Sequence, residues 1–148
     1  MFTGTPKVRN ATGAQVSLSP FSRVVRGYTP VETGGMLVHE GPLSVIGGRL
    51  AEESYKSLRE GSTAPNYVSW SKAGTGGWAG ITDKYWLAAV IPDQTSDVTG
   101  TYGFDTPEGA YQVGFTSQKP LVVASHGEAA VTSHVFAGAK EVRLLERY

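Results

Sequence analysis

The sequence predicts a single, mainly β domain, and three observations support this prediction. Aromatic and β-branched residues outweigh helix-forming residues over most of the chain, which favours strands. The 19 glycines and 8 prolines among 148 residues indicate many turns between short elements. Several segments alternate apolar and polar residues with the period of two that a strand requires. A chain of this length suits one domain with one sizeable core.

Charge and cysteine content exclude several classes of function. The 13 basic residues balance the 13 acidic ones and no basic patch stands out, so nucleic-acid binding is not expected. The absence of cysteine excludes disulfides and thiolate zinc sites. No apolar run approaches the ~20 residues that a helix needs to span a bilayer.

The first third of the chain indicates short strands. Gln15 to Tyr28 has strand composition, and Pro20 inside it predicts an edge or a bulge. Met36 to Leu50 contains short apolar runs together with Gly41-Pro42 and Gly47-Gly48, which indicates short strands with a tight bend.

The middle of the chain contains the first segment with helix propensity. Ala51 to Glu60 fits either a surface loop or one or two helical turns, and Gly61 would end a helix there. Tyr67 to Trp70 fits a strand, whereas Asp93 to Gly109 predicts a long polar loop or a hairpin connection.

The segment GGWAGITDKYWLAAVIP, Gly76 to Pro92, is rich in apolar and aromatic residues. Thr82 or Asp83 could cap one helical turn. Tyr85 to Ile91 then alternates in two sets that are both apolar, which predicts a strand covered on both faces. We expect a structural segment rather than a membrane-inserting loop, because the run alternates and ends at proline.

The last third predicts further strands and one helix. Tyr111 to Thr116 alternates as a half-buried strand does. Leu121 to Ala124 and Ala130 to Phe136 resemble two strands that pair with each other, and Lys140 to Tyr148 predicts a helix. The period-two positions give an expected core, which consists of Trp86, Leu87, Val90, Val113, Phe115, Val123 and Val135.

Candidate chemistry is sparse. The histidines His39, His126 and His134 form no HxxxH or HxH pair, and no carboxylate lies at ligand spacing beside them. Ser125 and His126 are neighbours, but adjacent strand residues point to opposite faces, so they do not predict a nucleophile with its base. We therefore expect no catalytic residue, no cofactor and no metal site.

The three tryptophans Trp70, Trp78 and Trp86 allow two interpretations. They could line an aromatic cleft for sugar or peptide, or they could anchor the core, where each ring buries a large area. The doubly apolar strand favours the core.

Four blocks, taken in order, resemble the periplasmic domain of the YidC-type membrane protein insertases. The blocks are SLSPFSRVVRGYTPVETGGMLVHEGPLSVIGGRL (Ser17 to Leu50), GGWAGITDKYWLAAVIPDQ (Gly76 to Gln94), YQVGFTSQKPLVV (Tyr111 to Val123) and VFAGAKEVRLLERY (Val135 to Tyr148). The Gly-Gly-Trp to Ile-Pro block is fairly specific, and the others are weaker when taken alone.

The resemblance implies a β-supersandwich of two packed antiparallel sheets with short helices near the C-terminus. It also implies a place on the periplasmic side of the bacterial inner membrane, between the first and second transmembrane helices of a multi-pass protein. The implied function is non-catalytic help in inserting and folding inner-membrane proteins, alone or with the Sec translocon. The implied partners are Sec components, nascent membrane proteins and the inner membrane.

Two other classes of function stay open at this point. A carbohydrate- or peptide-binding module would use an aromatic cleft formed by the tryptophans. A hydrolase or isomerase on the same sandwich would need a convergent acid–base pair, and none can be named.

In the resembling family, further strands usually precede the region that matches Val16. The chain is therefore expected to be one β-sandwich domain over residues 1–148 that forms the C-terminal part of a larger periplasmic domain. An open sheet edge would then favour pairing with a second copy.

The predicted C-terminal helix, Lys140 to Tyr148, carries the remaining candidate site. Its apolar side contains Val142 and Leu145, which are three residues apart and share a face. The candidate residues for a partner-proximal or membrane-proximal helix are Lys140, Val142, Arg143, Leu145 and Arg147.

Overall fold

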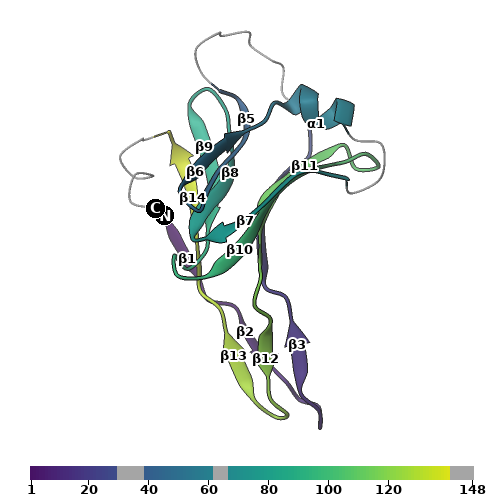
Figure 1. The fold of residues 1–148 in the computed structure, drawn as a ribbon, viewed down its shortest axis with the longest axis vertical. Helices are drawn as coiled ribbons and strands as arrows, with labels where there is room; N and C mark the ends of the chain where they lie inside the picture. Colours follow the sequence, from purple (N-terminus) through teal and green to yellow (C-terminus); the bar gives the residue numbers. More distant parts are fainter. Residues whose placement is uncertain (30–38, 62–66, 141–148) are drawn as a thin grey trace.

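The computed structural model describes residues 1–29, 39–61 and 67–140. These residues form two antiparallel sheets that pack together as a sandwich, with one short helix at its side (Figure 1). Two pairs of short strands project from one end of the sandwich as an extension. The predicted fold class, a mainly β sandwich, is confirmed.

The larger sheet has six strands, with the β8–β9 hairpin near its centre. Across the sheet the strands are β1 (Phe2–Gly4), β14 (Ser133–Ala139), β9 (Trp86–Ile91), β8 (Gly77–Thr82), β5 (Gly41–Ile46) and β6 (Arg49–Glu52). Gly47 and Gly48, with φ of 58° and 72°, form the predicted bend between β5 and β6. Strand β9 buries Leu87 and Ile91 in one cluster and Val90 in another, which confirms a strand covered on both faces.

The smaller sheet has four strands and contradicts one prediction. Its strands are β4 (Phe21–Arg26), β11 (Ala110–Ser117), β10 (Asp97–Asp105) and β7 (Tyr67–Thr75). Because β10 lies inside Asp93 to Gly109, the predicted polar connection is correct only for the turn at residues 93–96 and for the turn between β10 and β11. Gly100 explains the error: a Cβ there would lie 2.9 Å from a side-chain carbon of Ile46, so this glycine permits close packing rather than a turn.

The extension is built by strands from both ends of the chain. Its pairs are β2 (Lys7–Arg9) with β13 (Glu128–Ala130), and β3 (Val16–Leu18) with β12 (Leu121–Val123). The predicted pairing of Leu121 to Ala124 with Ala130 to Phe136 is wrong, because β12 pairs with β3 instead. Residues 130–136 are divided between β13, which pairs with β2, and β14, which pairs with β1 and β9. Buried Asn10 stabilises this arrangement by donating its side-chain N–H groups to the carbonyls of Val123 and Ala124, at 3.2 and 3.0 Å.

The sequence allowed either a loop or a short helix at Ala51 to Glu60, and the structure has the helix α1 (Tyr55–Gly61) there. The Ser54 hydroxyl accepts a hydrogen bond from the Ser57 amide at 3.0 Å, as an N-cap residue does, and the helix ends at Gly61 as predicted. Leu58 is fully buried against the sandwich. From residue 141 onward, the predicted C-terminal helix lies outside the described residues.

The two sheets enclose the core and share a buried polar link. The apolar residues between them are Tyr55, Leu58, Ala79, Ile81, Tyr102, Tyr111, Val113, Ile46, Val90, Val98 and Phe115. The hydroxyl of Tyr102 donates to the Ala51 carbonyl at 3.0 Å and accepts from the Ser44 hydroxyl at 2.6 Å. Burial raises the pKa of Tyr102, so this link is neutral. Trp70 stacks on the Tyr102 ring, with the two centroids 4.3 Å apart.

Most of the predicted core is confirmed. The buried members are Leu87, Val90, Val113, Phe115 and Val123. The prediction is wrong for Trp86 and Val135, which are 62% and 38% exposed. Alternation identifies residues that share a face of a strand, but it does not show how far the opposing layer extends over that face.

The two ends of the Gly76 to Gln94 block meet in the fold. The Gly77 amide donates to the Gln94 side-chain oxygen at 2.9 Å, and the Gln94 side-chain amide donates to the Gly77 carbonyl at 3.0 Å. Gly77 has a φ of 96°, and a Cβ there would lie 1.9 Å from the Val45 carbonyl oxygen. Only glycine fits this position, which gives the motif a structural reason.

Replacing Phe115 by alanine should lower the free energy of unfolding by about 3–5 kcal/mol, because Phe115 is 7% exposed in the core between the sheets. Phe21 on the neighbouring strand is 58% exposed, so Phe21→Ala is the matched control and should cost about 0.5 kcal/mol or less. Urea unfolding measures both values. Losses below about 1 kcal/mol for both variants would show that Phe115 is not a core residue.

Candidate interaction site at the β8–β9 hairpin

The polar residues singled out from the sequence make structural hydrogen bonds. Among the residues that the structure describes, no three His, Cys, Asp or Glu side chains gather as metal ligands. His39 contacts a backbone carbonyl at 2.9 Å, and His134 contacts the Thr3 hydroxyl at 3.0 Å. The Ser125 hydroxyl donates to the Thr12 carbonyl at 3.0 Å.

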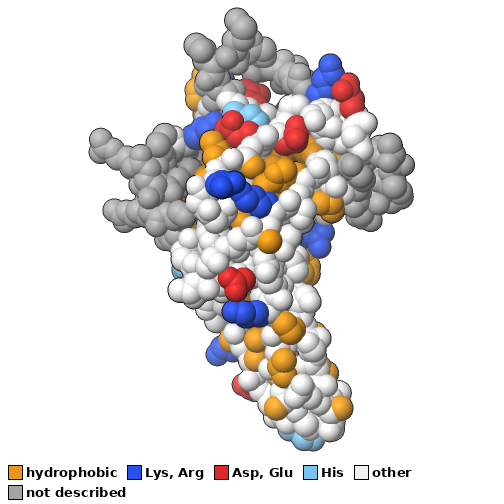
Figure 2. Space-filling view, viewed as in Figure 1, with side chains coloured by type: hydrophobic (Ala, Val, Ile, Leu, Met, Phe, Trp, Pro, Cys, Tyr) orange, Lys and Arg blue, Asp and Glu red, His pale blue; other side chains and the backbone are white. Residues whose placement is uncertain are grey.

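The face in Figure 2 carries scattered charged side chains with hydrophobic side chains between them. Its coloured residues form no continuous track of Lys and Arg. This face therefore has no broad basic surface, and any binding site on it must be recognised from individual contacts.

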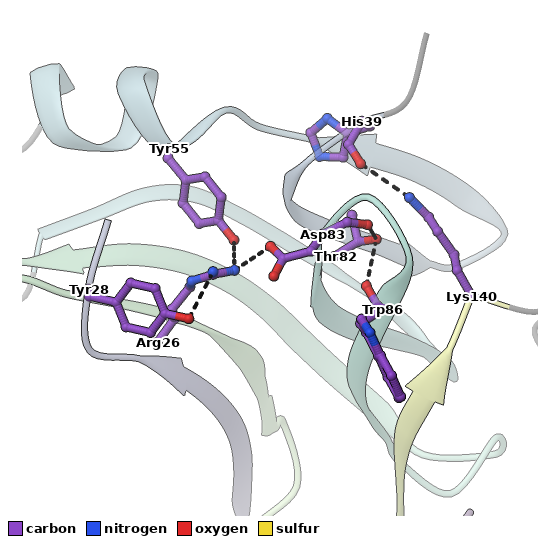
Figure 3. Close-up of polar contacts among 8 residues, drawn as sticks. All are labelled: Arg26, Tyr28, His39, Tyr55, Thr82, Asp83, Trp86 and Lys140. Carbon is purple, nitrogen blue, oxygen red and sulfur yellow. Dashed lines mark hydrogen bonds and ion pairs between the residues drawn. The ribbon is translucent and has the colours of Figure 1, made fainter. Parts of the chain in front are cut away.

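A single arginine joins the two sheets and the helix. Arg26, the last residue of β4, donates one Nη1 hydrogen bond to the Asp83 carboxylate in the β8–β9 turn and another to the Tyr55 hydroxyl of α1, at 2.9 Å (Figure 3). Its Nη2 donates to the Tyr28 hydroxyl at 3.3 Å. The guanidinium carbon also lies 4.7 Å from the Tyr28 ring centroid, a distance typical of a cation–π contact.

Burial makes these contacts energetically important. The side chains of Arg26 and Asp83 are 13% and 39% exposed. Burial lowers the pKa of Arg26, but the hydrogen bond and charge of Asp83, together with Tyr55, outweigh it and raise the pKa, so the guanidinium stays charged. Arg26 Nε is buried without a hydrogen-bond partner among the described residues. The hydrogen bonds of Nη1 and Nη2 must therefore offset the free-energy cost of burying the guanidinium. Burial raises the pKa of Tyr55 to about 12, although the charge of Arg26 opposes this.

The β8–β9 connection is a tight hairpin, so the predicted helical turn at Thr82 or Asp83 is wrong. The Asp83 amide donates to the Trp86 carbonyl at 2.8 Å, and the Thr82 hydroxyl donates to the same carbonyl at 3.2 Å. Tyr85 and Trp86 are 66% and 62% exposed, so the cover predicted for both faces of Tyr85 to Ile91 does not reach these two residues at its start. Lys84 Nζ lies 5.1 Å from the Tyr85 ring centroid.

A shallow groove of about 280 Å³ lies beside the hairpin. Tyr28 and Trp86 line it together with Val25 and Arg26, and Figure 3 shows the two aromatic residues on either side of the Arg26–Asp83 pair. The small residues Ala137 and Gly138 of β14 also line this groove. The groove and the exposed hairpin together make the candidate interaction site.

A second, more apolar groove of about 290 Å³ lies where the extension joins the sandwich. Its lining includes Pro6, Leu18, Phe21, Leu121 and Val131. Most of these side chains come from strands of the extension or from residues next to them.

The whole chain has relatives among known proteins. The family model of the YidC periplasmic domain matches residues 1–148. The chain belongs to the YidC periplasmic domain family. Three relatives, each named membrane protein insertase YidC, are 47%, 39% and 41% identical to the whole chain: those of Granulibacter bethesdensis, Acidiphilium cryptum and Agrobacterium fabrum. The chain spans 24–26% of the length of these relatives.

This YidC periplasmic domain lies on the periplasmic side of the bacterial inner membrane. No helix in residues 1–29, 39–61 and 67–140 is long and apolar enough to cross a membrane.

The structure separates the three tryptophans of this domain. Trp78 is 4% exposed in the core, Trp70 stacks on Tyr102, and Trp86 stands in solvent. The expectation of core packing is correct for Trp78 and wrong for Trp86, and the three rings do not form a shared cleft.

Of the predicted C-terminal candidates, only Lys140 is described. Its ammonium donates to the His39 carbonyl at 3.2 Å, and its amide donates to the Tyr85 carbonyl at 2.9 Å. Val142, Arg143, Leu145 and Arg147 lie outside the described residues.

Sequence reasoning missed the Arg26 cluster. Arg26 is 57 residues from Asp83 and 29 from Tyr55, so no local spacing brings them together. The one available signal was an arginine and a tyrosine, Arg26 and Tyr28, directly after the apolar pair Val24 and Val25 at the end of the strand.

Alkaline pH should destabilise the domain through Tyr55. Its pKa in the folded state, about 12, exceeds the ordinary value of 10.0, so its contribution is complete below pH 10 and is lost as pH rises through 12. Tyr55→Phe should therefore lose less stability between pH 10 and pH 12 than the unsubstituted domain does. Urea unfolding at the two pH values measures this, with Tyr85→Phe, at a 66% exposed position, as the control. An equal alkaline loss with and without Tyr55 would contradict the prediction.

Proposed function

We propose that this domain is the non-catalytic periplasmic part of a membrane protein insertase that helps to insert and fold inner-membrane proteins, alone or with the Sec translocon. The observation that carries the proposal is the family match over residues 1–148, with relatives named membrane protein insertase. The proposed partners are nascent membrane proteins, Sec components, and the inner membrane, which the rest of the protein would reach through transmembrane helices.

The hydrogen bonds of the domain support a role without chemistry. Ser125 donates to a backbone carbonyl and lies in the turn between β12 and β13 of the extension. The most buried charged contact, between Arg26 and Asp83, joins structural elements, and salt bridges of this kind position secondary structure without needing a substrate.

A carbohydrate- or peptide-binding module receives less support than the insertase role. That alternative needed a cleft shared by Trp70, Trp78 and Trp86. Trp78 is buried, so a ligand at the surface could stack on Trp86 but not on the set of three.

Pairing with a second copy through a sheet edge stays a prediction. The nine-residue strand β7 pairs with β10 on one side, and no described strand pairs with its other side. Partly buried Lys72 lies near the middle of this edge, and an edge lysine is a common means of discouraging such pairing.

The proposed coupling to the membrane part can be tested in the full-length insertase. Val142→Asp combined with Leu145→Asp places two charges on the apolar side of the predicted C-terminal helix, where they cannot pack against an apolar partner. We expect a several-fold loss of insertion of a model membrane protein in cells depleted of the unsubstituted insertase.

The matched control is Arg143→Glu combined with Arg147→Glu, which changes charge on the polar side and should reduce insertion less. Immunoblotting must show equal amounts of each variant. If the double-aspartate protein inserts its substrate at the normal rate, the C-terminal segment is only a tether and the proposed coupling is wrong.

A further inference from the structure

Two adjacent aromatic side chains stand in solvent at one corner of the sandwich. Tyr85 and Trp86 are 66% and 62% exposed, and Tyr28 across the groove is 65% exposed. Single exposed apolar residues are ordinary, but several large rings close together indicate an interaction surface.

The fold holds these rings in place. Hydrogen bonds from the Asp83 amide and the Thr82 hydroxyl to the Trp86 carbonyl close the hairpin, and Arg26 binds the Asp83 carboxylate from the other sheet. The Lys140 amide fixes the Tyr85 carbonyl at 2.9 Å. The rings are therefore displayed on a rigid hairpin, which lowers the entropic cost of binding.

The charges around the rings favour an anionic partner. Asp83 is neutralised by Arg26, so its carboxylate does not oppose an incoming anion. Lys84 lies over the Tyr85 ring, with its Nζ 5.1 Å from the centroid, and Lys140 follows the β14 residue that pairs with Trp86. The hairpin and the adjacent end of β14 therefore combine two amphipathic rings with two lysines.

We propose that the β8–β9 hairpin docks on the anionic surface of the lipid bilayer, with Tyr85 and Trp86 at the level of the headgroups and Lys84 beside the lipid phosphates. Trp and Tyr are the residues enriched where a protein meets the membrane–water interface, and lysines near an anionic leaflet add electrostatic attraction. This contact is peripheral rather than inserted, because the hairpin exposes only two rings, Tyr85 and Trp86, and its remaining apolar residues are buried or partly buried.

A lipid surface fits this hairpin better than a peptide or sugar does. The exposed rings are on a protruding hairpin beside a shallow groove, whereas small ligands and peptides usually occupy concave sites that enclose them. The domain lies on the periplasmic side of the inner membrane, so a bilayer is present beside it. Lipid binding by the hairpin is a property separate from the proposed role in insertion, and it can be measured without any insertion reaction.

Binding of the 148-residue chain to extruded vesicles tests the proposal. One set of vesicles contains phosphatidylcholine alone and the other adds phosphatidylglycerol, and co-sedimentation gives the bound fraction. We expect binding to the anionic vesicles, with Trp86→Ala weakening it about tenfold and Lys84→Glu about fivefold. Trp86→Phe should retain part of the binding, because it keeps an aromatic ring at the same place.

The control is Phe21→Ala, which removes a 58% exposed ring at the opposite end of β4 from Arg26 and should leave binding unchanged. Thermal melting of each variant verifies that the fold is retained. Absence of binding to either kind of vesicle would overturn the proposal. So would binding that Trp86→Ala and Lys84→Glu leave unchanged, or equal binding to both kinds of vesicle.

Discussion

The salt bridge between Arg26 and Asp83 connects parts of the molecule that no other described ion pair connects. Arg26 ends a strand of the four-stranded sheet, whereas Asp83 lies in the turn of the central hairpin of the six-stranded sheet. A guanidinium that is 13% exposed is costly unless it is hydrogen-bonded, so the sheets must pack where Asp83 and Tyr55 can reach it. The Arg26 contacts thereby link the position of α1 to that of the hairpin.

A second polar link, deeper in the sandwich, limits how the sheets can slide. Tyr102 of the smaller sheet bonds both Ser44 and the Ala51 carbonyl of the larger one, and all three groups would lose their partners if either sheet shifted by one residue. Together with the Arg26 cluster, this link gives the sandwich two fixed points within a mostly apolar interface. The apolar residues supply most of the stabilisation, whereas the polar links specify the alignment of the sheets.

The sequence predicted features that depend on neighbouring residues and missed those that depend on distant ones. The doubly covered strand β9 and the bend at Gly47-Gly48 follow from local pattern, and both were predicted correctly. Strand β10 was missed because Asp93 to Gly109 is a polar segment, although Gly100 within it makes a close contact with Ile46 rather than a turn. The Arg26 cluster and the exposure of Trp86 depend on how far one sheet covers the other. The spacing of residues along the sequence does not show this extent of cover.

If Arg26 holds the hairpin in place, its removal should loosen the hairpin before the rest of the sandwich. Native-state hydrogen exchange on Arg26→Met tests this directly at the Asp83 amide, which donates to Trp86, and at the Lys140 amide, which donates to Tyr85. The account predicts that both exchange faster than in the unsubstituted domain, by a larger factor than the amides that join β10 and β11. Equal acceleration at all of these amides, or no acceleration at Asp83, would contradict the central role given to Arg26.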